Sequence, residues 1–343
     1  MTTRTTDELK QGLARPADFE ALTRRAVLKA AGITAAGVLA APALAQGISN
    51  RAVTNIVPFS AGTAPDILAR RIAEAFQQRW AQSFLVENRP GASGTIGSTL
   101  VARAAPDGHT LLVTPSTFAM SPSLYRNLAY DPVKSFAPVV QLTTIGFALL
   151  LHQSAGADVA AFVKNAKAQP GLLSYASPGR GTPHHLLMEL FRQQTGIDVM
   201  HVPASNFSSA MTDLLGGRVA AMFTTVTIAK SIPADGVVKI VGVASPDRLP
   251  SLPDMPTLSE LGIPGVQYQD WYAMFAPAGV SPEIVGKLNT TANEILGSSD
   301  IKTWLASQGM VPAGGTPDQM RNLLAVDMKH WSAVVRKAGI EPI

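Results

Sequence analysis

One stretch near the start of the chain constrains the fold most, because it turns from an apolar strand into an amphipathic helix through a short loop. Residues 53–57 read as a buried strand, and apolar side chains recur at helical spacing over residues 67–80. The loop between them ends in Pro65, which suits a first helical turn, and Asp66 adds a carboxylate to that turn. The free N–H groups and positive dipole end of such a helix favour an anion by about 0.3–1 kcal/mol. The stretch therefore predicts a strand–loop–helix unit that can hold a negative group.

The N-terminus has the order of regions that marks an export signal. Arg24 and Arg25 precede the uncharged run 30–41, and small residues follow as far as Ala45. The paired arginines indicate the twin-arginine route. The run has no polar face for an amphipathic helix, and it is shorter than the roughly 20 residues that a membrane span needs. We therefore expect residues 1–45 to be a signal peptide that is cleaved between Ala45 and Gln46, which predicts a periplasmic protein.

The composition fits a globular protein of about two domains. The chain has 343 residues, of which 46% are apolar and 15% charged. It contains no cysteine, which excludes disulfides, thiolate nucleophiles and Cys-ligated metal centres. The expected signal peptide contains six of the 28 basic and four of the 24 acidic residues, so the mature chain would carry a net charge of +2. With no run of basic residues interleaved with aromatics, we expect no nucleic-acid partner.

Strands and helices alternate through the rest of the chain and give way to a helical tail. The expected strands are residues 53–57, 84–86, 110–114, 148–151, 172–175, 199–203, 219–225, 239–244 and 271–277. The expected helices are residues 67–80, 100–103, 159–168, 184–194, 210–215, 283–296, 301–308 and 317–337. Such alternation predicts parallel strands, whose ligands bind at the carboxyl ends. Ser60, Thr63, Ser116 and Thr117 would share that edge.

A second loop repeats the design of the first. Residues 176–183 lie between an expected strand and an expected helix, and they are rich in glycine and hydroxyl-bearing residues. Thr182 is the expected N-cap and Pro183 the first-turn residue, so backbone N–H groups are again free to face a ligand. The chain therefore supplies two loops of the kind that binds an anion.

The strong enzyme motifs are absent. The sequence contains no P-loop, no H-E-x-x-H, no G-x-S-x-G and no acidic calcium loop. Gly179 and Gly181 form half of a dinucleotide fingerprint, but His184 stands where the third glycine belongs. His184 and His185 point about 100° apart on a helix, which disfavours a shared metal. We expect neither a cofactor nor a metal.

Several candidate residues also have a structural explanation. Packing or a hydrogen bond explains His185 more simply than direct ligand contact, and capping explains Asp66. Arg180 can pair with a ligand carboxylate or be a solvated loop residue, and the sequence favours neither. Trp271 and Tyr272 fit a protein core better than a platform for a ligand.

A series of short motifs runs through the mature chain in a specific order. They are V-P-F at 57–59 with Gly62, D-I-L-A-R at 66–70, V-E-N-R-P-G-A at 86–92, A-R-A-A-P-D-G at 102–108, Y-D-P-V at 130–133, Q-P-G at 169–171, S-Y-A-S at 174–177 with Gly179 and Gly181, H-V-P at 201–203, D-L-L-G-G at 213–217, P-D-M-P-T at 253–257 and F-A-P-A-G at 275–279. In order and spacing they resemble the Bug receptors, the extracytoplasmic substrate-binding proteins of tripartite tricarboxylate transporters. The resemblance covers essentially the whole mature chain.

The resemblance implies an α/β, type II-like periplasmic binding protein of two lobes, each a mixed sheet flanked by helices, with the ligand cleft between them. Lobe 1 would comprise residues 46–147 and 272–343, and lobe 2 residues 148–271. Such a receptor captures a small carboxylate-bearing molecule by lobe closure. It delivers that molecule to the membrane components of a tripartite transporter, and we expect it to be a monomer.

Carried over position by position, the resemblance also implies the ligand-binding residues. They are Phe59, Ser60, Ala61, Gly62, Thr63 and Asp66 from the first loop, the pair Ser116 and Thr117, then Ser177, Gly179, Arg180, Gly181, Thr182 and His185 from the second loop, and finally Ala204, Ser205, Asn206 and Thr224.

The chain departs from the usual family pattern at three of these places. Gly62-Thr63 and Pro65 replace paired glycines and a threonine, which makes the first loop stiffer and bulkier. Residues 204–206 are Ala-Ser-Asn where an aromatic, a polar residue and a glycine are common. Thr224 stands where an acidic residue is common. We therefore expect a pocket that has lost an aromatic ring and a negative charge.

Two other functions use the same residues. An exported serine hydrolase would need Ser177 or Ser116 beside His185 and Asp66, but no nucleophile-elbow pattern surrounds either serine. A ligand sensor would present the same closed lobes to a membrane kinase. We expect no enzyme, and only the partner separates a transport receptor from a sensor.

Overall fold

The structure is a computed structural model that describes residues 51–342. The predicted signal peptide, with its expected cleavage site at Ala45 and Gln46, lies outside the described residues. None of the described helices combines the length and apolar character needed to cross a lipid bilayer.

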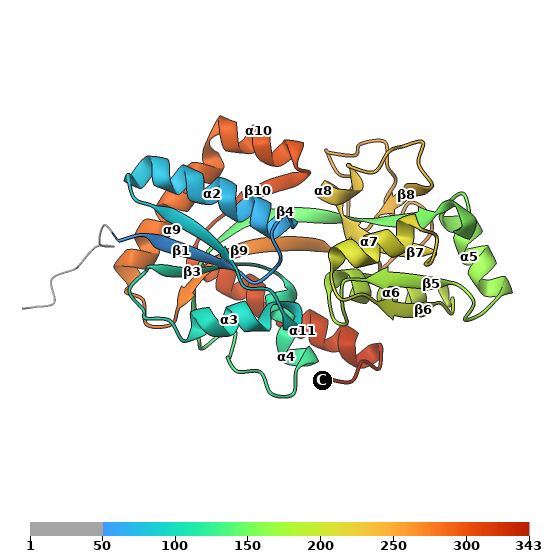
Figure 1. Ribbon diagram of the computed structural model, residues 1–343, viewed down its shortest axis with the longest axis horizontal. Helices are drawn as coiled ribbons and strands as arrows, with labels where there is room; N and C mark the ends of the chain where they lie inside the picture. Colours follow the sequence, from blue (N-terminus) through green and yellow to red (C-terminus); the bar gives the residue numbers. More distant parts are fainter. Residues whose placement is uncertain (1–50, 343) are drawn as a thin grey trace, which may run out of the picture. The chain divides into compact units, whose positions relative to one another are not determined.

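The described strands form one mixed sheet with two parallel blocks (Figure 1). They are β1 Val53–Val57, β2 Phe84–Asn88, β3 Thr110–Pro115, β4 Phe136–His152, β5 Ser174–Ser177, β6 Met200–Pro203, β7 Ala221–Thr225, β8 Val238–Val243, β9 Gln269–Pro277 and β10 Met310–Gly314. The order is β2-β1-β3-β9-β4-β7-β5-β6, and β8 and β10 also pair with β4. The strands β1, β2 and β3 are parallel, as are β5, β6 and β7, whereas β4 and β9 run antiparallel to their neighbours.

The helices connect and cover these strands. They are α2 Ala64–Trp80, α3 Thr95–Ala102, α4 Thr117–Leu124, α5 Val159–Ala168, α6 Pro183–Thr195, α7 Phe207–Leu215, α8 Val226–Ala229, α9 Pro282–Gly297, α10 Ser299–Ser307 and α11 Pro317–Lys337, with short 3-10 turns at Ala92–Gly94 and Gln153–Ala155. Both α2 and α6 begin with a proline in the first turn, as the sequence predicts for the two loops. Each therefore follows directly on a strand-end loop with its first N–H groups unused by the helix.

The long strand β4 joins the two parallel blocks. Its first part, as far as Gly146, pairs with β9 and β10, and its second part, from Phe147, pairs with β7 and β8. In Figure 1 this strand runs from one block into the other. The strand predicted over 148–151 is only the end of β4, which begins at Phe136. Gly146 and the polar residues before it interrupt the apolar pattern in the sequence, but pairing with the neighbouring strands extends the strand through them.

Two apolar cores lie on either side of this junction, which confirms the two-lobed α/β architecture that the resemblance implies. Around β1, β3 and the first part of β4, the core is built on buried aromatics such as Phe76 and Phe275. Around β5, β7 and the second part of β4, it is built on Phe191 and Phe223. Each lobe therefore buries its own apolar interior.

The last helix, α11, contributes to both cores. Met320 and Leu324 near its start pack with lobe 1, whereas Trp331 and Val335 near its end pack with the core of lobe 2. The ring of Trp331 meets that of Tyr268 edge-to-face at 4.8 Å. The lobes are thus joined by β4, by the chain at the start of β9, between Tyr268 and Trp271, and by α11.

Candidate functional site

A cleft of about 550 Å³ lies between the ends of the strands of the two lobes. It is lined by Pro58, Phe59, Ser60, Ala61, Gly62, Thr63, Ala64, Pro65, Pro90, Gly91, Ala92, Ser93, Gly94, Pro115, Thr117, Phe147, Pro178, Thr182, Pro183, His184, Ser205, Asn206, Phe207, Ser208, Thr225, Ile228, Asp270 and Tyr272. The strand-end loops of both parallel blocks therefore meet at one cavity, where a doubly wound sheet places its ligand.

The first loop contributes every residue from Phe59 to Pro65 to this lining. Asp66 is buried beneath the loop and does not line the cleft. Its carboxylate accepts hydrogen bonds from the Gly62 N–H at 2.8 Å and from Asn88 Nδ2 at 2.9 Å, and it forms an ion pair with Arg70. Burial alone would raise the pKa of Asp66, but the bonds from Arg70, Gly62 and Asn88 outweigh it and lower the pKa. Asp66 therefore holds the loop in shape.

The second loop contributes Thr182 to the lining, whereas Ser177, Gly179, Arg180 and Gly181 do not reach it. Arg180 is exposed on the surface. Gly181 has a φ of +75°, and a Cβ built on it would lie 2.3 Å from Leu124 Cδ1 of α4. The loop can take this course only because glycine tolerates the left-handed conformation and the close approach.

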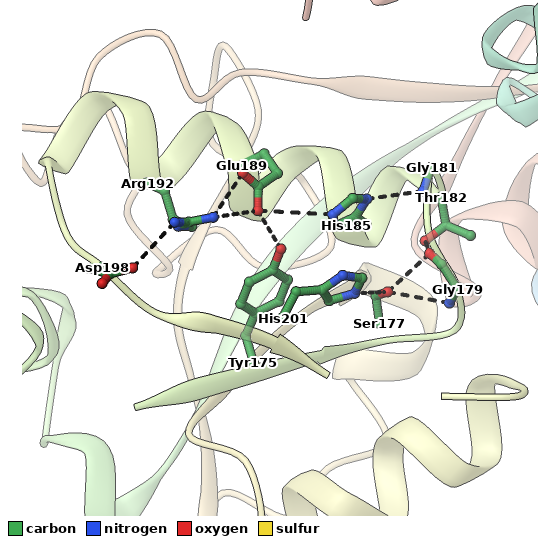
Figure 2. Close-up of polar contacts among 10 residues, drawn as sticks. All are labelled: Tyr175, Ser177, Gly179, Gly181, Thr182, His185, Glu189, Arg192, Asp198 and His201. Atoms are coloured by element: carbon green, nitrogen blue, oxygen red, sulfur yellow. Dashed lines mark hydrogen bonds and ion pairs between the residues drawn. The ribbon is translucent and has the colours of Figure 1, made fainter. Parts of the chain in front are cut away.

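A network of polar side chains supports the second loop from behind (Figure 2). The Gly181 N–H donates to His185 Nδ1 at 3.0 Å, and the Ser177 hydroxyl lies 2.7 Å from His201 Nε2. The rings of His185 and His201 stack with their centroids 4.1 Å apart. Further back, Glu189 accepts a hydrogen bond from the Tyr175 hydroxyl at 2.5 Å. His185 therefore orients the loop and does not line the cleft.

Both stacked histidines are neutral at pH 7. Burial, reinforced by the positive charges of Arg180 and Arg192, lowers the pKa of His185 to about 4. Burial and then the neighbouring His185 lower the pKa of His201 to about 3. A neutral His185 can accept the Gly181 N–H, which a protonated ring could not.

The groups that a serine hydrolase would need are not brought together. Ser177 is buried, lies outside the cleft lining, and contacts His201 and not His185. Asp66 is bound to the first loop of the other lobe. Ser116 is fully buried and directs its hydroxyl to Tyr268. Neither Ser177 nor Ser116 is thus placed with His185 and Asp66 in the arrangement of base and orienting group that nucleophilic catalysis needs.

The other residues carried over from the family also include some that line the cleft and some that do not. Thr117, Ser205 and Asn206 line the cleft, whereas Ala204 and Thr224 do not. Because successive side chains of a strand point to opposite faces, Thr225 lines the cleft in place of its neighbour Thr224.

Three lining residues that were not among the predicted ligand-binding residues supply polar or aromatic groups of particular interest. His184 lines the cleft although His185 was the candidate, because it is the ring of His184 that packs beside Phe147. Phe207 and Asp270 supply an aromatic ring and a carboxyl, so the cleft still contains the two groups that positions 204 and 224 had lost. The sequence signal for Asp270 is a single carboxylate inside an otherwise apolar and aromatic strand.

The charge of the cleft is unusual for an anion site, because no Lys or Arg lines it within residues 51–342. Burial lowers the pKa of His184 to about 3, so its ring is neutral. Thr117 Oγ1 and His184 Nδ1 are buried and have no hydrogen-bond partner among the described residues. A bound anion would have to rely on backbone N–H groups, hydroxyls and the Asn206 amide.

Several known proteins are similar to this chain in sequence. Residues 68–340 match the family described as tripartite tricarboxylate transporter family receptor. The chain is 34% identical over 292 residues to protein BugT of Bordetella pertussis, covering 84% of this chain and 90% of BugT. It is 32% identical over 320 residues to a protein of the tcbD-tcbE intergenic region of Pseudomonas sp. (strain P51), covering 93% of this chain and 95% of that protein.

Solved structures share the fold as well. An R. palustris protein solved with adipate superposes with a TM-score of 0.81 at 33% identity, covering 85% of this chain and 99% of that one. The periplasmic binding protein BugD gives a TM-score of 0.79 at 30% identity, with 85% and 99% covered. MatC from Rhodopseudomonas palustris with bound malate gives 0.75 at 34% identity, with 83% and 99% covered. Sequence and fold agree with the resemblance to the Bug receptors, and the chain belongs to the tripartite tricarboxylate transporter receptor family.

Proposed function

We propose that the protein is a periplasmic solute-binding receptor that captures a small carboxylate and delivers it to the membrane components of a tripartite tricarboxylate-type transporter. One observation carries the proposal: two strand-to-helix loops, one from each lobe, line a single cleft. The relatives solved with adipate and malate support a carboxylate as the ligand. The family supports a binding role and not an enzymatic one.

Hydrogen bonds to the carboxylate supply only part of the affinity. Three or four charge-assisted hydrogen bonds at roughly 1.5–3 kcal/mol each contribute about 5–12 kcal/mol, against an association cost of about 4–15 kcal/mol. A micromolar dissociation constant corresponds to about −8 kcal/mol. Closure of the lobes over the ligand would supply the remainder, because it excludes water and strengthens each bond.

The hinge for such closure would lie where β4 and the chain at the start of β9 pass between the lobes. β4 changes partners between Gly146 and Phe147, and β9 begins at Gln269. These positions adjoin the proposed lobe boundaries at residues 147/148 and 271/272. A membrane partner, whether a transporter or a sensor kinase, would distinguish the closed form of the receptor from the open form.

A thermal-shift screen against mono- and dicarboxylates tests the proposal. We expect saturable stabilisation by at least one small carboxylate, because a ligand that binds only the folded state raises the melting temperature. Native mass spectrometry of protein purified without ligand removal would identify a co-purified acid. The proposal fails if no carboxylate stabilises the protein at any concentration.

Two threonine variants provide a matched comparison. Thr117 and Thr224 are both buried with hydroxyls that find no hydrogen-bond partner within residues 51–342, but only Thr117 lines the cleft. Thr117→Val should lower carboxylate affinity about 2–10-fold, which is the worth of one hydrogen bond of about 0.5–1.5 kcal/mol. Thr224→Val should leave that affinity unchanged. Equal effects of the two substitutions would argue against this cleft as the binding site.

A further inference from the structure

Asp270 places a buried carboxyl group in the wall of the cleft. It lies near the start of β9, where the chain enters lobe 1 from lobe 2, and is only 2% exposed. Asp270 and Tyr272 both line the cleft, as alternate residues of one strand should, whereas Trp271 between them packs into the lobe 1 core. The backbone thus presents this carboxyl to whatever the cleft holds.

The hydrogen bonds of Asp270 converge on one oxygen. Oδ1 accepts from the Trp271 N–H at 2.8 Å, from the Tyr268 hydroxyl at 3.0 Å and from the Ser116 N–H at 3.2 Å. The Ser116 hydroxyl also interacts with the carboxyl and lowers its pKa, and all hydrogen bonds of defined geometry that Asp270 accepts within residues 51–342 end on Oδ1. Three donors fix the orientation of the group and leave its second oxygen with unused acceptor capacity.

Among residues 51–342, the surroundings of Asp270 contain no positive charge. None of the described Lys or Arg residues lines the cleft, and the titratable groups around the carboxyl in this part of the chain are Tyr268 and Tyr272 on its own segment, Asp327 of α11 behind Trp271, and the neutral His184 in the cleft. Burial raises the pKa of Asp270 to about 6, and the hydrogen bonds limit the rise. At neutral pH the group is therefore a buried carboxylate without a counter-ion, which proteins rarely tolerate without a function.

We propose that Asp270 determines ligand specificity: its free Oδ2 accepts a hydrogen bond from an ammonium group, so the cleft selects amino-substituted carboxylic acids over the corresponding simple dicarboxylic acids. The inference rests on the proposed function, since the ligand's carboxylate would still bind to the loops. A ligand ammonium supplies the counter-charge that the site lacks. A hydroxyl donor fits the same oxygen but brings no charge, so hydroxy acids rank second.

A simple dicarboxylate has no ammonium group to donate a hydrogen bond to Asp270 and brings a second negative charge instead. Its second carboxylate would enter a cleft that already holds a negative charge and no cation, so Asp270 would have to take up a proton. Bound amino acid, in contrast, favours the ionised form and lowers the pKa of Asp270. Near pH 6, binding of the amino acid should therefore release protons, and binding of the dicarboxylate should take them up.

Titration calorimetry with three matched pairs tests the inference: succinate and aspartate, glutarate and glutamate, adipate and 2-aminoadipate. At pH 8 we expect the amino acid to bind at least tenfold more tightly in the pair of the right length. Asp270→Asn keeps the oxygen that accepts the three hydrogen bonds but puts an N–H₂ donor in place of Oδ2. This variant should abolish the preference, while Asp327→Asn, a buried carboxyl outside the cleft, should retain it.

The outcomes separate the inference from the proposed function. If dicarboxylates bind as tightly as their amino counterparts, or if Asp270→Asn leaves the ratio unchanged, the specificity role of Asp270 is wrong although the receptor function stands. If none of these acids, and none in the wider carboxylate screen, binds at all, the proposed function fails with it. Should Asp270→Asn not fold, the wild-type protein decides: buffers of different ionisation enthalpy at pH 6 give the sign of the proton transfer, and proton uptake with the amino acid would overturn the inference.

Discussion

At the scale of single residues, the site is built as much by side chains that never touch the cleft as by those that line it. Asp66 fixes the first loop through the Gly62 N–H, and His185 fixes the second through the Gly181 N–H. Both supports lie four residues beyond the N–H that they bind, in the first turn of the helix that follows. The loops are therefore ordered before any ligand arrives, which lowers the entropy cost of binding.

Gly181 should be irreplaceable in the second loop. Gly181→Ala would combine a left-handed backbone with a clash against Leu124, and we expect a loss of about 2–4 kcal/mol in the free energy of unfolding. Gly62→Ala is the control, because φ is +79° there but nothing lies within 4 Å of the new Cβ. That variant should lose only about 1–2 kcal/mol. Denaturant unfolding measures both, and equal losses would contradict the packing of Gly181 on Leu124.

His185 should make stability depend on pH. Its pKa is about 4 in the folded protein, below the ordinary value of 6.5, so the unfolded chain binds more protons between these values. Stability should therefore fall as the pH drops from about 6.5 to about 4, by up to about 3 kcal/mol for this residue. His185→Asn keeps an acceptor for the Gly181 N–H but cannot titrate, and should show a shallower fall. Parallel unfolding curves for the two proteins would refute a neutral buried His185.

Residue-level function was only partly predictable from the sequence. Phe59 to Thr63, Thr182 and Asn206 line the cleft, as loop residues at strand ends should, and their contact with a ligand stays a prediction. Which of the two neighbours His184 and His185 lines the cleft could not be predicted, because it depends on which ring packs beside Phe147. The role of Asp270 depends on contacts across long sequence distances, such as that with Ser116, which no local pattern encodes.

At the scale of elements, the helix starts connect stability with binding. Asn206 is the N-cap of α7, where its Oδ1 accepts the Ser209 N–H at 2.9 Å, and it also lines the cleft. Ser281 caps α9 in the same way through the Ile284 N–H, away from the cleft. One pair of residues can thus separate the cost of losing a cap from the cost of losing a ligand contact.

Three cap variants follow from this pair. Asn206→Ala and Ser281→Ala should each cost about 0.5–2 kcal/mol of stability, but only the first should weaken carboxylate binding. Asn206→Asp should retain the cap and the stability, while its negative charge in a cleft without cations weakens binding at least about tenfold. Unfolding curves and calorimetric titrations of the three proteins check this. Undiminished binding to Asn206→Asp would mean that the anion lies elsewhere.

Most elements could be predicted from the sequence, but the helices α4 and α8 and parts of the sheet were missed. Helix α11 was predicted with its observed bounds, 317–337, because its apolar period is long and a proline marks its start. The first part of β4 and the short β10 were missed. They pair with each other in antiparallel register, and their mixed polar and apolar residues are stabilised by that pairing more than by local preference.

At the scale of the whole molecule, we propose that two independently packed lobes hold one carboxylate between their loops. The lobes are joined by β4, by the chain at the start of β9 and by α11. Because only a few segments connect the lobes, small changes at the strand junctions can close them while each core stays intact. The ligand then stabilises the closed arrangement by the difference in its affinity for the closed and open forms.

Titration calorimetry of the wild-type protein with the acid that stabilises it most in the thermal-shift screen tests this claim most directly. We predict one binding site per chain and a dissociation constant near the micromolar range, together with a loss of at least tenfold in affinity for Gly181→Ala, which alters the loop of one lobe only. A titration with no saturable heat, or an affinity that survives disruption of the second loop unchanged, would contradict a carboxylate held between the two lobes.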